Sequence, residues 1–368
     1  MKIIRKLSVL SFAVVSSTLL LTSCDQNENE LTPLEGKSAI AQVLAKTTIN
    51  SASLSGCSPT NNILFDSPIN NLISPTNKNQ NGMSGWKKVN SLSDEFNYTS
   101  KQTLLNKWKY GFVNNYTGPP PTLWSGDQVS LGGGELTLTA QETGSGKNRR
   151  LKCGMITSKA SSSYPLYQEA RVKVSNSSLA NAVWMLSDNP GTTEEIDNLE
   201  AYGPRLRPDG TQVSKPFFAD RLHLSHHTFQ SSPRLDYQPK IQTWMSQKKS
   251  NGNCNRTNDV VWSQKYHIYG VKWVSATKLE YYVDGKKVKT VDGLNITDGI
   301  DPQGYTKCNG LKREMRMLIS QAAQHWRYGS IDNFWNSPDI KSGNATKMRI
   351  DWIRVFTPTG TENRRSCN

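Results

Sequence analysis

From residue 86 onward the chain alternates apolar and polar residues in short runs that turn residues separate. Successive side chains of an extended strand point to opposite faces, so a period of two predicts strands with one buried face. We expect strands over residues 135–140, 169–174, 182–187, 278–283, 287–291 and 348–356. Asp284-Gly285, between two of these runs, is typical of a two-residue hairpin turn. The pattern therefore predicts antiparallel neighbours.

Neither long helical periodicity nor an internal repeat interrupts this pattern. Residues 86–358 are long enough for one large domain, since single all-β sandwiches reach roughly 250 residues. We predict an all-β fold, a β-sandwich jelly roll of two antiparallel sheets whose concave face forms a substrate-binding cleft. Residues 25–85 are rich in Ser, Asn and Thr and are predicted to form a linker, and residues 359–368 a C-terminal tail.

The N-terminus predicts export. Three basic residues among the first six precede an apolar run over residues 7–21, which is too short for a membrane span and is typical of a secretory signal. The following Ser23-Cys24 resembles a bacterial lipobox, in which Cys24 becomes the lipid-modified first residue of the mature chain; a plain secretory signal is the alternative. We therefore expect residues 1–24 to be a lipoprotein signal peptide. The protein would lie at the cell surface or outer membrane, or be secreted, with only its lipid anchor touching the membrane.

The composition adds a strong positive charge. The formal net charge is +14, and removing residues 1–23 takes away three basic residues and leaves +11. A surplus of this size suggests an anionic partner. The basic residues form no helical stripe and no nucleic-acid-binding motif, so we expect no nucleic acid. An acidic or sulfated polysaccharide fits an exported protein better.

Five cysteines lie beyond Cys24. An exported chain permits disulfides, and an odd count leaves one cysteine unpaired or intermolecular. No Cys-x-x-Cys pattern occurs, which argues against a structural zinc site. Since Cys254 and Cys308 both lie in Asn/Gly-rich loop sequence, we predict that these two pair.

The main chemical signal is a group of three carboxylates, Glu195, Asp197 and Glu200. In a regular strand Glu195 and Asp197 share a face, whereas Glu200, five positions after Glu195, points to the other face. A one-residue bulge across Asn198-Leu199 would return Glu200 to the face of the other two. The sequence therefore predicts a bulged strand with three acids on one face.

Three crowded acids repel one another, so the arrangement needs a chemical reason. The simplest alternative is a solvated strand edge or a helix cap. However, the apolar run at 182–187, the turn residues at 188–191 and the stop at 201–204 place the motif on a hairpin strand. Cleavage of a glycosidic bond with retention needs a carboxylate nucleophile and a carboxylic acid about 5–5.5 Å apart. A third carboxylate between them can orient the nucleophile and raise the pKa of its partner.

The chain resembles the family 16 glycoside hydrolases, and within them the agar-degrading branch of β-agarases and β-porphyranases. The family pattern E-[ILV]-D-x-x-E fits residues 195–200 in its bulged form. Further matching motifs follow in the expected order at residues 115–119 with Trp124, 153–159, 164–167, 169–171, 193–197, 199–203, 223–229, 236–239, 269–273, 324–327 and 351–355. The resemblance spans nearly all of residues 86–358, which it identifies as a glycoside hydrolase catalytic domain.

The resemblance implies a role for each acid. Glu195 corresponds to the nucleophile, Glu200 to the acid/base and Asp197 to the carboxylate that hydrogen-bonds between them. It implies that the two anionic neighbours keep Glu200 protonated near neutral pH. No cofactor and no catalytic metal are required. Some family members hold a structural calcium on the convex face, and Asp351 could take part in such a site.

Aromatic and basic residues in these motifs are candidates for sugar binding, because tryptophans stack on the apolar faces of sugar rings. We predict substrate contacts from Trp124, Trp184 and Trp326, with core packing as the usual alternative for a sandwich tryptophan. Trp273 and Trp352 are predicted to be core residues.

His226 and His227 are neighbours on one strand, so one is expected to face the cleft and the other not. Hydrogen bonds to a sugar or a sulfate are favoured over a metal for this pair, because no acid or cysteine completes a local ligand set. Arg327 could bind a sulfate or ring hydroxyls, with a surface ion pair as the alternative. A structural role remains the alternative for the histidines.

The sequence departs from the agarase pattern at two places. Asn198 replaces the usual apolar residue at the bulge, and residues 320–323 lack the acid that agarases carry before the 324–327 motif. The loops at 206–220 and 246–260 also look long for the family. The fine specificity could therefore differ from that of a standard agarase.

We predict a retaining endo-hydrolase of β-1,4 bonds in an algal galactan polysaccharide such as agar, including sulfated or modified agar. The rivals are a β-porphyranase proper and, further behind, a laminarinase or carrageenase. A glycan-binding surface lipoprotein is the alternative from another class, although a pure binder does not need three clustered acids. We expect a monomer.

Overall fold

The computed structural model describes residues 86–359 except 190, 204–220, 240–242, 247–261, 297–298 and 342. The predicted signal peptide, linker and nearly all of the C-terminal tail lie outside these residues, as do almost all positions of the two long loops. Their boundaries and lipidation at Cys24 therefore stay predictions. Among the described helices, none is long and apolar enough to cross a membrane.

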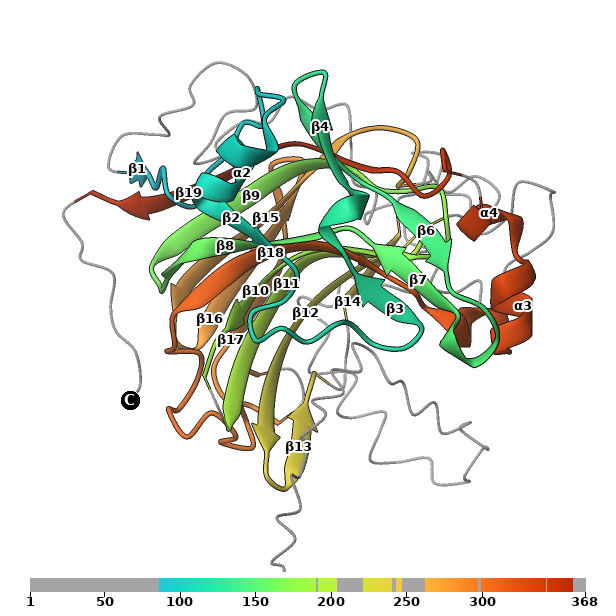
Figure 1. The fold of residues 1–368 in the computed structure, drawn as a ribbon. Coiled ribbons are helices and arrows are strands. Elements are labelled where there is room, and N and C mark those ends of the chain that lie inside the picture. Colours follow the sequence, from blue (N-terminus) through green and yellow to red (C-terminus); the bar gives the residue numbers. More distant parts are fainter. Residues whose placement is uncertain are drawn as a thin grey trace, which may run out of the picture.

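Two large antiparallel sheets form the domain (Figure 1). The first, here called the supporting sheet, contains in spatial order β17 (Lys286–Asp292), β16 (Lys278–Val283), β15 (His267–Ser275), β9 (Leu166–Lys173), β19 (Met348–Pro358), β5 (Glu135–Leu138) and β4 (Val129–Gly132), with β1 (Trp86–Lys88) beside β19. The second, the acid-bearing sheet, contains β13 (Arg234–Tyr237), β12 (Arg221–Ser231), β11 (Thr192–Ala201), β10 (Ala180–Ser187), β18 (Met315–Ala322), β8 (Met155–Ser162) and β2 (Trp108–Tyr110), with β14 (Thr243–Ser246) beside β12.

The remaining elements are short. A small third sheet joins β3 (Thr122–Trp124), β7 (Arg150–Cys153) and β6 (Ala140–Thr143). The helices are α2 (Lys101–Lys107), α3 (Ile331–Asn336) and α4 (Pro338–Lys341), with 3-10 turns at Gly126–Gln128, Gly146–Asn148 and His325–Tyr328. Figure 1 shows α3 and α4 at the same end of the molecule as β6 and β7. The longest described helix has seven residues, in line with the absence of helical periodicity in the sequence.

The core lies between the two large sheets and consists of the inward-facing side chains of both. Val183, Ile196 and Leu199 contribute from the acid-bearing sheet, and Val271 and Ile353 from the supporting sheet; all five are fully buried. Trp273 is fully buried in this core, and Trp352 is buried under the Arg354 guanidinium. Solved structures with this architecture are given below. The predicted all-β jelly-roll sandwich is confirmed.

The hairpin turn at Asp284-Gly285 is also confirmed. Val283 pairs directly with Lys286, so the loop has two residues. Both have positive φ, 45° at Asp284 and 82° at Gly285, as a turn that matches the right-handed strand twist requires.

A bulge interrupts β11 at the predicted place. On the β12 side the register shifts between Asp197, which pairs with Ser225, and Glu200, which pairs with His223. Two residues of β11, Asn198 and Leu199, therefore oppose one residue of β12. The bulge returns Glu200 to the face of Asp197 while Leu199 still enters the core.

Asn198 ties this bulge to the other sheet. Its side chain is fully buried and points across the sandwich. The Gln168 amide on β9 donates to Asn198 Oδ1 at 3.2 Å, and Asn198 Nδ2 donates to the Tyr269 carbonyl on β15 at 3.2 Å. The departure from an apolar residue at this position is thus matched by polar partners in the supporting sheet.

The described cysteines differ in state. Cys153 is a free, buried thiol, and Cys308 is disulfide-bonded. The predicted partner, Cys254, lies outside the described residues, so the proposed pairing stays a prediction.

Replacing Asn198 by Val should lower the free energy of unfolding by about 1–3 kcal/mol, because the Gln168 amide then stays buried without its acceptor. The double variant Asn198→Val/Gln168→Leu should lose less free energy of unfolding than the sum of the two single variants, since both buried polar side chains are removed together. Urea unfolding of the wild type, the two single variants and the double variant measures this coupling. A double variant that loses the sum of the two single losses would contradict it.

Candidate active site

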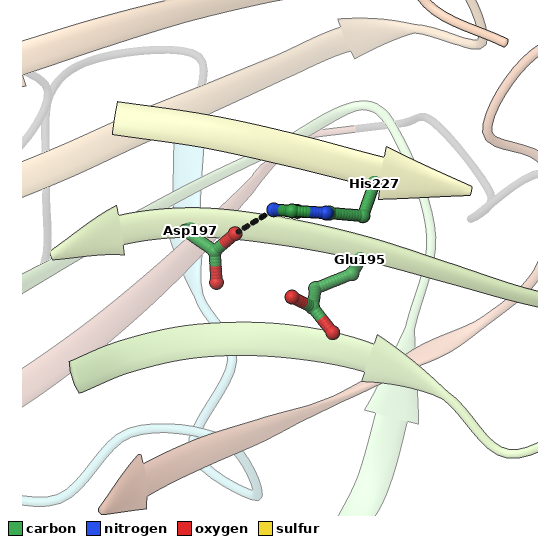
Figure 2. Close-up of side chains that lie close together, drawn as sticks. All are labelled: Glu195, Asp197 and His227. Carbon is green, nitrogen blue, oxygen red and sulfur yellow. Dashed lines mark ion pairs between the residues drawn. The ribbon is translucent and has the colours of Figure 1, made fainter. Parts of the chain in front are cut away.

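The three acids of β11 face a cleft on the outer side of the acid-bearing sheet. Strand register places Glu195 opposite His227, Asp197 opposite Ser225 and Glu200 opposite His223. Figure 2 shows the Glu195 and Asp197 carboxylates close together beneath the His227 ring. The bulge therefore brings all three carboxylates into one site, as the sequence predicts.

The cleft has a volume of about 630 Å³, including its open mouth. Its walls combine the three carboxylates with aromatic and small side chains: Pro119, Trp124, Ala180, Ala182, Trp184, Glu195, Asp197, Glu200, His227, Phe229, Ser320 and Ala322. Apolar walls around a few convergent polar groups are typical of a ligand-binding site.

Trp124 and Trp184 form the aromatic wall of the cleft, and their contact with a substrate stays a prediction. The Trp124 indole donates to the Gln321 carbonyl at 2.8 Å, and the Trp184 indole donates to Ser320 Oγ at 3.1 Å. Phe112 stacks on Trp124 with ring centroids 5.4 Å apart and also packs against Trp184 at 5.9 Å. These contacts fix the ring planes before any ligand enters.

Glu195, Asp197 and His227 form one electrostatic group. His227 Nε2 lies 3.6 Å from Asp197 Oδ2 (Figure 2). On its other side, His227 Nδ1 lies 3.7 Å from Asp236 Oδ1 on β13. Burial raises the pKa of Glu195 to about 7, against the opposing effect of His227. Burial and the charge of Glu195 raise the pKa of Asp197 well above its ordinary value. Asp197 therefore holds a proton and donates it to Glu195 in a hydrogen bond.

His227 carries the compensating charge. Burial alone would lower the pKa of His227, but Asp236, Glu195 and Asp197 raise it to about 10. The imidazole is therefore an imidazolium at neutral pH, and its ring stacks on Phe229 with the planes 3° apart.

Glu200 is held differently. His223 Nδ1 lies 2.5 Å from Glu200 Oε2, and the Tyr202 hydroxyl donates to Glu200 Oε1. Burial raises the pKa of Glu200, but the hydrogen bonds from His223 and Tyr202 outweigh it, and the net pKa is lowered. The residue after Tyr202 is Gly203, whose φ is 73°. A Cβ at this position would lie 1.8 Å from the Ser177 carbonyl oxygen, so only glycine fits there.

Three residues of the site lie close enough together to hold a metal ion. Glu195, Asp197 and His227 each offer one ligand atom, all within 4.8 Å of one another. The imidazolium already supplies the positive charge between the carboxylates, so we propose no ion there. Asp351, the candidate for a structural calcium site, is paired with Arg171 at 2.6 Å, and calcium binding there stays a prediction.

Comparison with known proteins decides the family. The family model described as "Beta-porphyranase A-D, GH16 domain" matches residues 86–358. The chain belongs to glycoside hydrolase family 16. It is 38% identical over 291 residues to "Beta-agarase" of Phocaeicola plebeius, covering 73% of this chain and 84% of that relative. It is 38% identical to "Beta-agarase AgaA" of Microbulbifer thermotolerans, covering 74% of this chain but 59% of that relative's length.

Solved structures agree with the fold. The structure of beta-agarase B from Zobellia galactanivorans superimposes with a TM-score of 0.62 at 31% identity, covering 80% of this chain and 99% of that one. The resemblance to family 16 drawn from the sequence motifs is thereby confirmed.

Within this family 16 domain, the protonation of Glu200 differs from the sequence-based expectation. Glu195 and Asp197 were expected to keep Glu200 protonated by repulsion. The expectation is wrong in this geometry because it left out His223 and Tyr202, which both stabilise the ionised carboxylate. The proton of the site lies on the Glu195–Asp197 pair instead.

Three predicted sugar ligands, His226, Trp326 and Arg327, are not among the residues that line the cleft. His226 lies on the opposite face of β12 from His227, and its Nε2 contacts the Gly299 carbonyl at 2.9 Å. Arg327 is fully buried, and its Nη1 donates to the Tyr202 carbonyl. Trp326 packs on Tyr202 with ring centroids 5.9 Å apart, beside the cleft residues Ala180 and Ala322. The alternation of a strand puts only one of two adjacent histidines in a cleft.

His223, Tyr202, Phe229 and Asp236 belong to the site but were not selected from the sequence. Strand alternation offered a signal for two of them, because His223 and Phe229 are even-numbered steps away from His227. Asp236 reaches the site only through the pairing of β12 with β13, and Tyr202 lies just after the end of β11. Neither residue could therefore be placed in the site from sequence spacing alone.

The charge on His227 predicts how stability depends on pH. Its pKa of about 10 lies above the ordinary value of 6.5, so its stabilising effect is complete below pH 6.5 and is lost as the pH rises toward 10. Between about pH 7 and 10 the wild type should therefore lose stability more steeply than His227→Gln. Urea unfolding at several pH values measures both slopes, and Asp236→Asn should give an intermediate slope. Equal slopes for the wild type and His227→Gln would refute the assigned charge.

Proposed function

We propose that this family 16 protein is a retaining endo-glycoside hydrolase that cleaves β-1,4 linkages in agar-type galactans. The observation that carries the proposal is the bulge in β11, which places three carboxylates on one face inside an aromatic cleft. The relatives named beta-agarases support the substrate class.

In the first step Glu195 attacks the anomeric carbon and the bond to the leaving oxygen breaks. Because the hydrogen bonds from His223 and Tyr202 favour ionised Glu200, this step runs through the form of the protein in which Glu200 has first taken up a proton. That form gives the proton to the leaving oxygen, and a covalent glycosyl-enzyme forms on Glu195. In the second step Glu200 takes a proton from water, and the water oxygen displaces Glu195 from the anomeric carbon. The configuration at that carbon is retained because it is inverted twice.

Asp197 orients the nucleophile in this scheme. Its proton is donated to the Glu195 carboxylate, which favours the ionised form of Glu195 against the effect of burial. The His227 imidazolium acts in the same direction. These two groups keep a buried nucleophile available near neutral pH.

Trp124 and Trp184, which belong to one aromatic wall of the cleft, supply stacking platforms for sugar rings. We expect no cofactor for catalysis.

A β-porphyranase is the second candidate, favoured by the description of the matching family model. The segment 320–323 contributes Ser320 and Ala322 to the cleft and no carboxylate. A missing anion removes repulsion toward a sulfated sugar, so sulfated agar remains within the proposed substrate range. Neither relative reported above is named a laminarinase or a carrageenase.

The N-terminal apolar run and the cysteine that follows it support export of the protein. Cys24 after the apolar run supports a lipid anchor at the cell surface or outer membrane, with secretion as the alternative. A glycan-binding lipoprotein without activity would not need His223, Tyr202 and His227 arranged around three acids. A monomer is proposed.

Replacing Glu195 by Gln should abolish turnover and leave oligosaccharide binding measurable by calorimetry, because the amide keeps the shape but cannot attack. Replacing Glu200 by Gln should lower kcat/KM on polysaccharide by about 10²–10⁴-fold, the usual contribution of a general acid. Glu142→Gln, at an exposed ion pair with Arg149, is the control and should behave like the wild type. Turnover that survives in Glu195→Gln would exclude it as nucleophile.

The substrate class is tested with agarose, porphyran, κ-carrageenan and laminarin, followed by identification of the products. Even-numbered oligosaccharides of several lengths from agarose or porphyran are expected, since an endo-enzyme cuts a repeating disaccharide internally. Activity on laminarin alone would reject the agar assignment.

A further inference from the structure

Both carboxylate oxygens of Glu200 are already bound within the protein. Oε2 faces His223 Nδ1 at 2.5 Å, and Oε1 accepts from the Tyr202 hydroxyl. His223 and Tyr202 are both fully buried, while Glu200 keeps a small exposed fraction at the cleft. The two donors therefore approach the carboxylate from the protein side and leave the cleft side open to a ligand.

Neither donor is free to move aside. His223 lies on β12 directly opposite Glu200, where the two strands pair. Tyr202 is held from behind by Arg327, whose Nη1 donates to the Tyr202 carbonyl and whose guanidinium lies 5.6 Å from the Tyr202 ring centroid. The buried Arg327 thus supports the site through Tyr202 instead of touching a sugar.

We propose that His223 and Tyr202 are positioning residues that together fix the carboxylate of Glu200 and set the pH at which it gains and loses its proton. The inference rests on the proposed acid/base role of Glu200. Two donors on an ionised carboxylate favour its charged form, which is the form that must accept a proton from water in the second step.

Other charged groups face this pair and must be separated from it. Glu195 and Asp197 on β11 favour the protonated form of Glu200, whereas His227 on β12 favours its ionised form. Lys289 on β17 faces His223 and, with burial, keeps that imidazole neutral. A neutral His223 can still donate from Nδ1, so its effect on Glu200 is that of a hydrogen bond rather than of a full charge.

The test is the pH profile of kcat/KM on agarose for His223→Phe and Tyr202→Phe. Each variant removes one donor, so the proton affinity of Glu200 rises. Because Glu200 titrates at lower pH than Glu195, its titration sets the acid limb of the profile, and that limb should move up by about one pH unit. Coupling among the three acids does not change this direction, because weaker donors raise the proton affinity of the whole group. A structural defect alone would lower the profile without moving its limb.

Matched controls exist elsewhere in the protein. His267 is paired with Asp284 at 2.8 Å on the supporting sheet, and the control for His223→Phe is His267→Phe. The Tyr328 hydroxyl donates to Asp339 at 2.9 Å, and the control for Tyr202→Phe is Tyr328→Phe. Both controls remove a similar buried contact away from Glu200 and should keep the wild-type limb. Limbs that stay at the wild-type pH in both His223→Phe and Tyr202→Phe overturn the inference.

Two further measurements keep the outcome clear. If Glu200→Gln turns over polysaccharide like the wild type, the proposed acid/base role fails; if it is inactive while the limbs of the two donor variants do not move, only the inference fails. Should His223→Phe not fold, ¹³C-carboxyl NMR of the wild type, with Glu200→Gln for assignment, follows Glu200 directly. Titration below the ordinary value of 4.5 supports the inference, and titration above it overturns it.

Discussion

One extra residue in a strand determines the rest of this site. Alternation would send Glu200 into the core, where Leu199 belongs, and leave two acids in the cleft. The bulge at Asn198-Leu199 corrects both faces at once, since Leu199 stays in the core and Glu200 turns to the cleft. Asn198 anchors the bulge to the opposite sheet through Gln168 and the Tyr269 carbonyl, so the packing of the whole sandwich supports the spacing of the acids.

Gathering three carboxylates in a buried site is electrostatically unfavourable, and the surrounding residues show how the protein offsets it. The Glu195–Asp197 pair shares a proton and faces the His227 imidazolium. Glu200 stays ionised through hydrogen bonds from His223 and Tyr202. The site thus contains two differently stabilised carboxylate environments, the condition under which two acids can take different chemical roles.

Much of the fold could be read from the sequence because its signals are local. Period-two alternation located the strands, and Asp284-Gly285 located a hairpin turn. The three acids of the candidate site could also be found from the sequence, since their spacing puts them on one face only with a bulge. The partners of Glu200 could not be found in this way, because Tyr202 follows the end of β11 and His223 lies on the neighbouring strand β12. Arg327 shows the opposite error: its motif lies near the cleft, but its side chain turns inward to Tyr202.

The most direct test of the account is to trap the covalent intermediate. A 2-deoxy-2-fluoro glycoside of the substrate sugar with a good leaving group should accumulate on the protein as the covalent intermediate. The fluorine slows both steps, whereas the activated leaving group speeds only the first, so the intermediate forms faster than it is hydrolysed. Digestion and mass spectrometry are expected to place the label on Glu195. A label on another residue, or release of the inverted anomer with no label, would contradict the account.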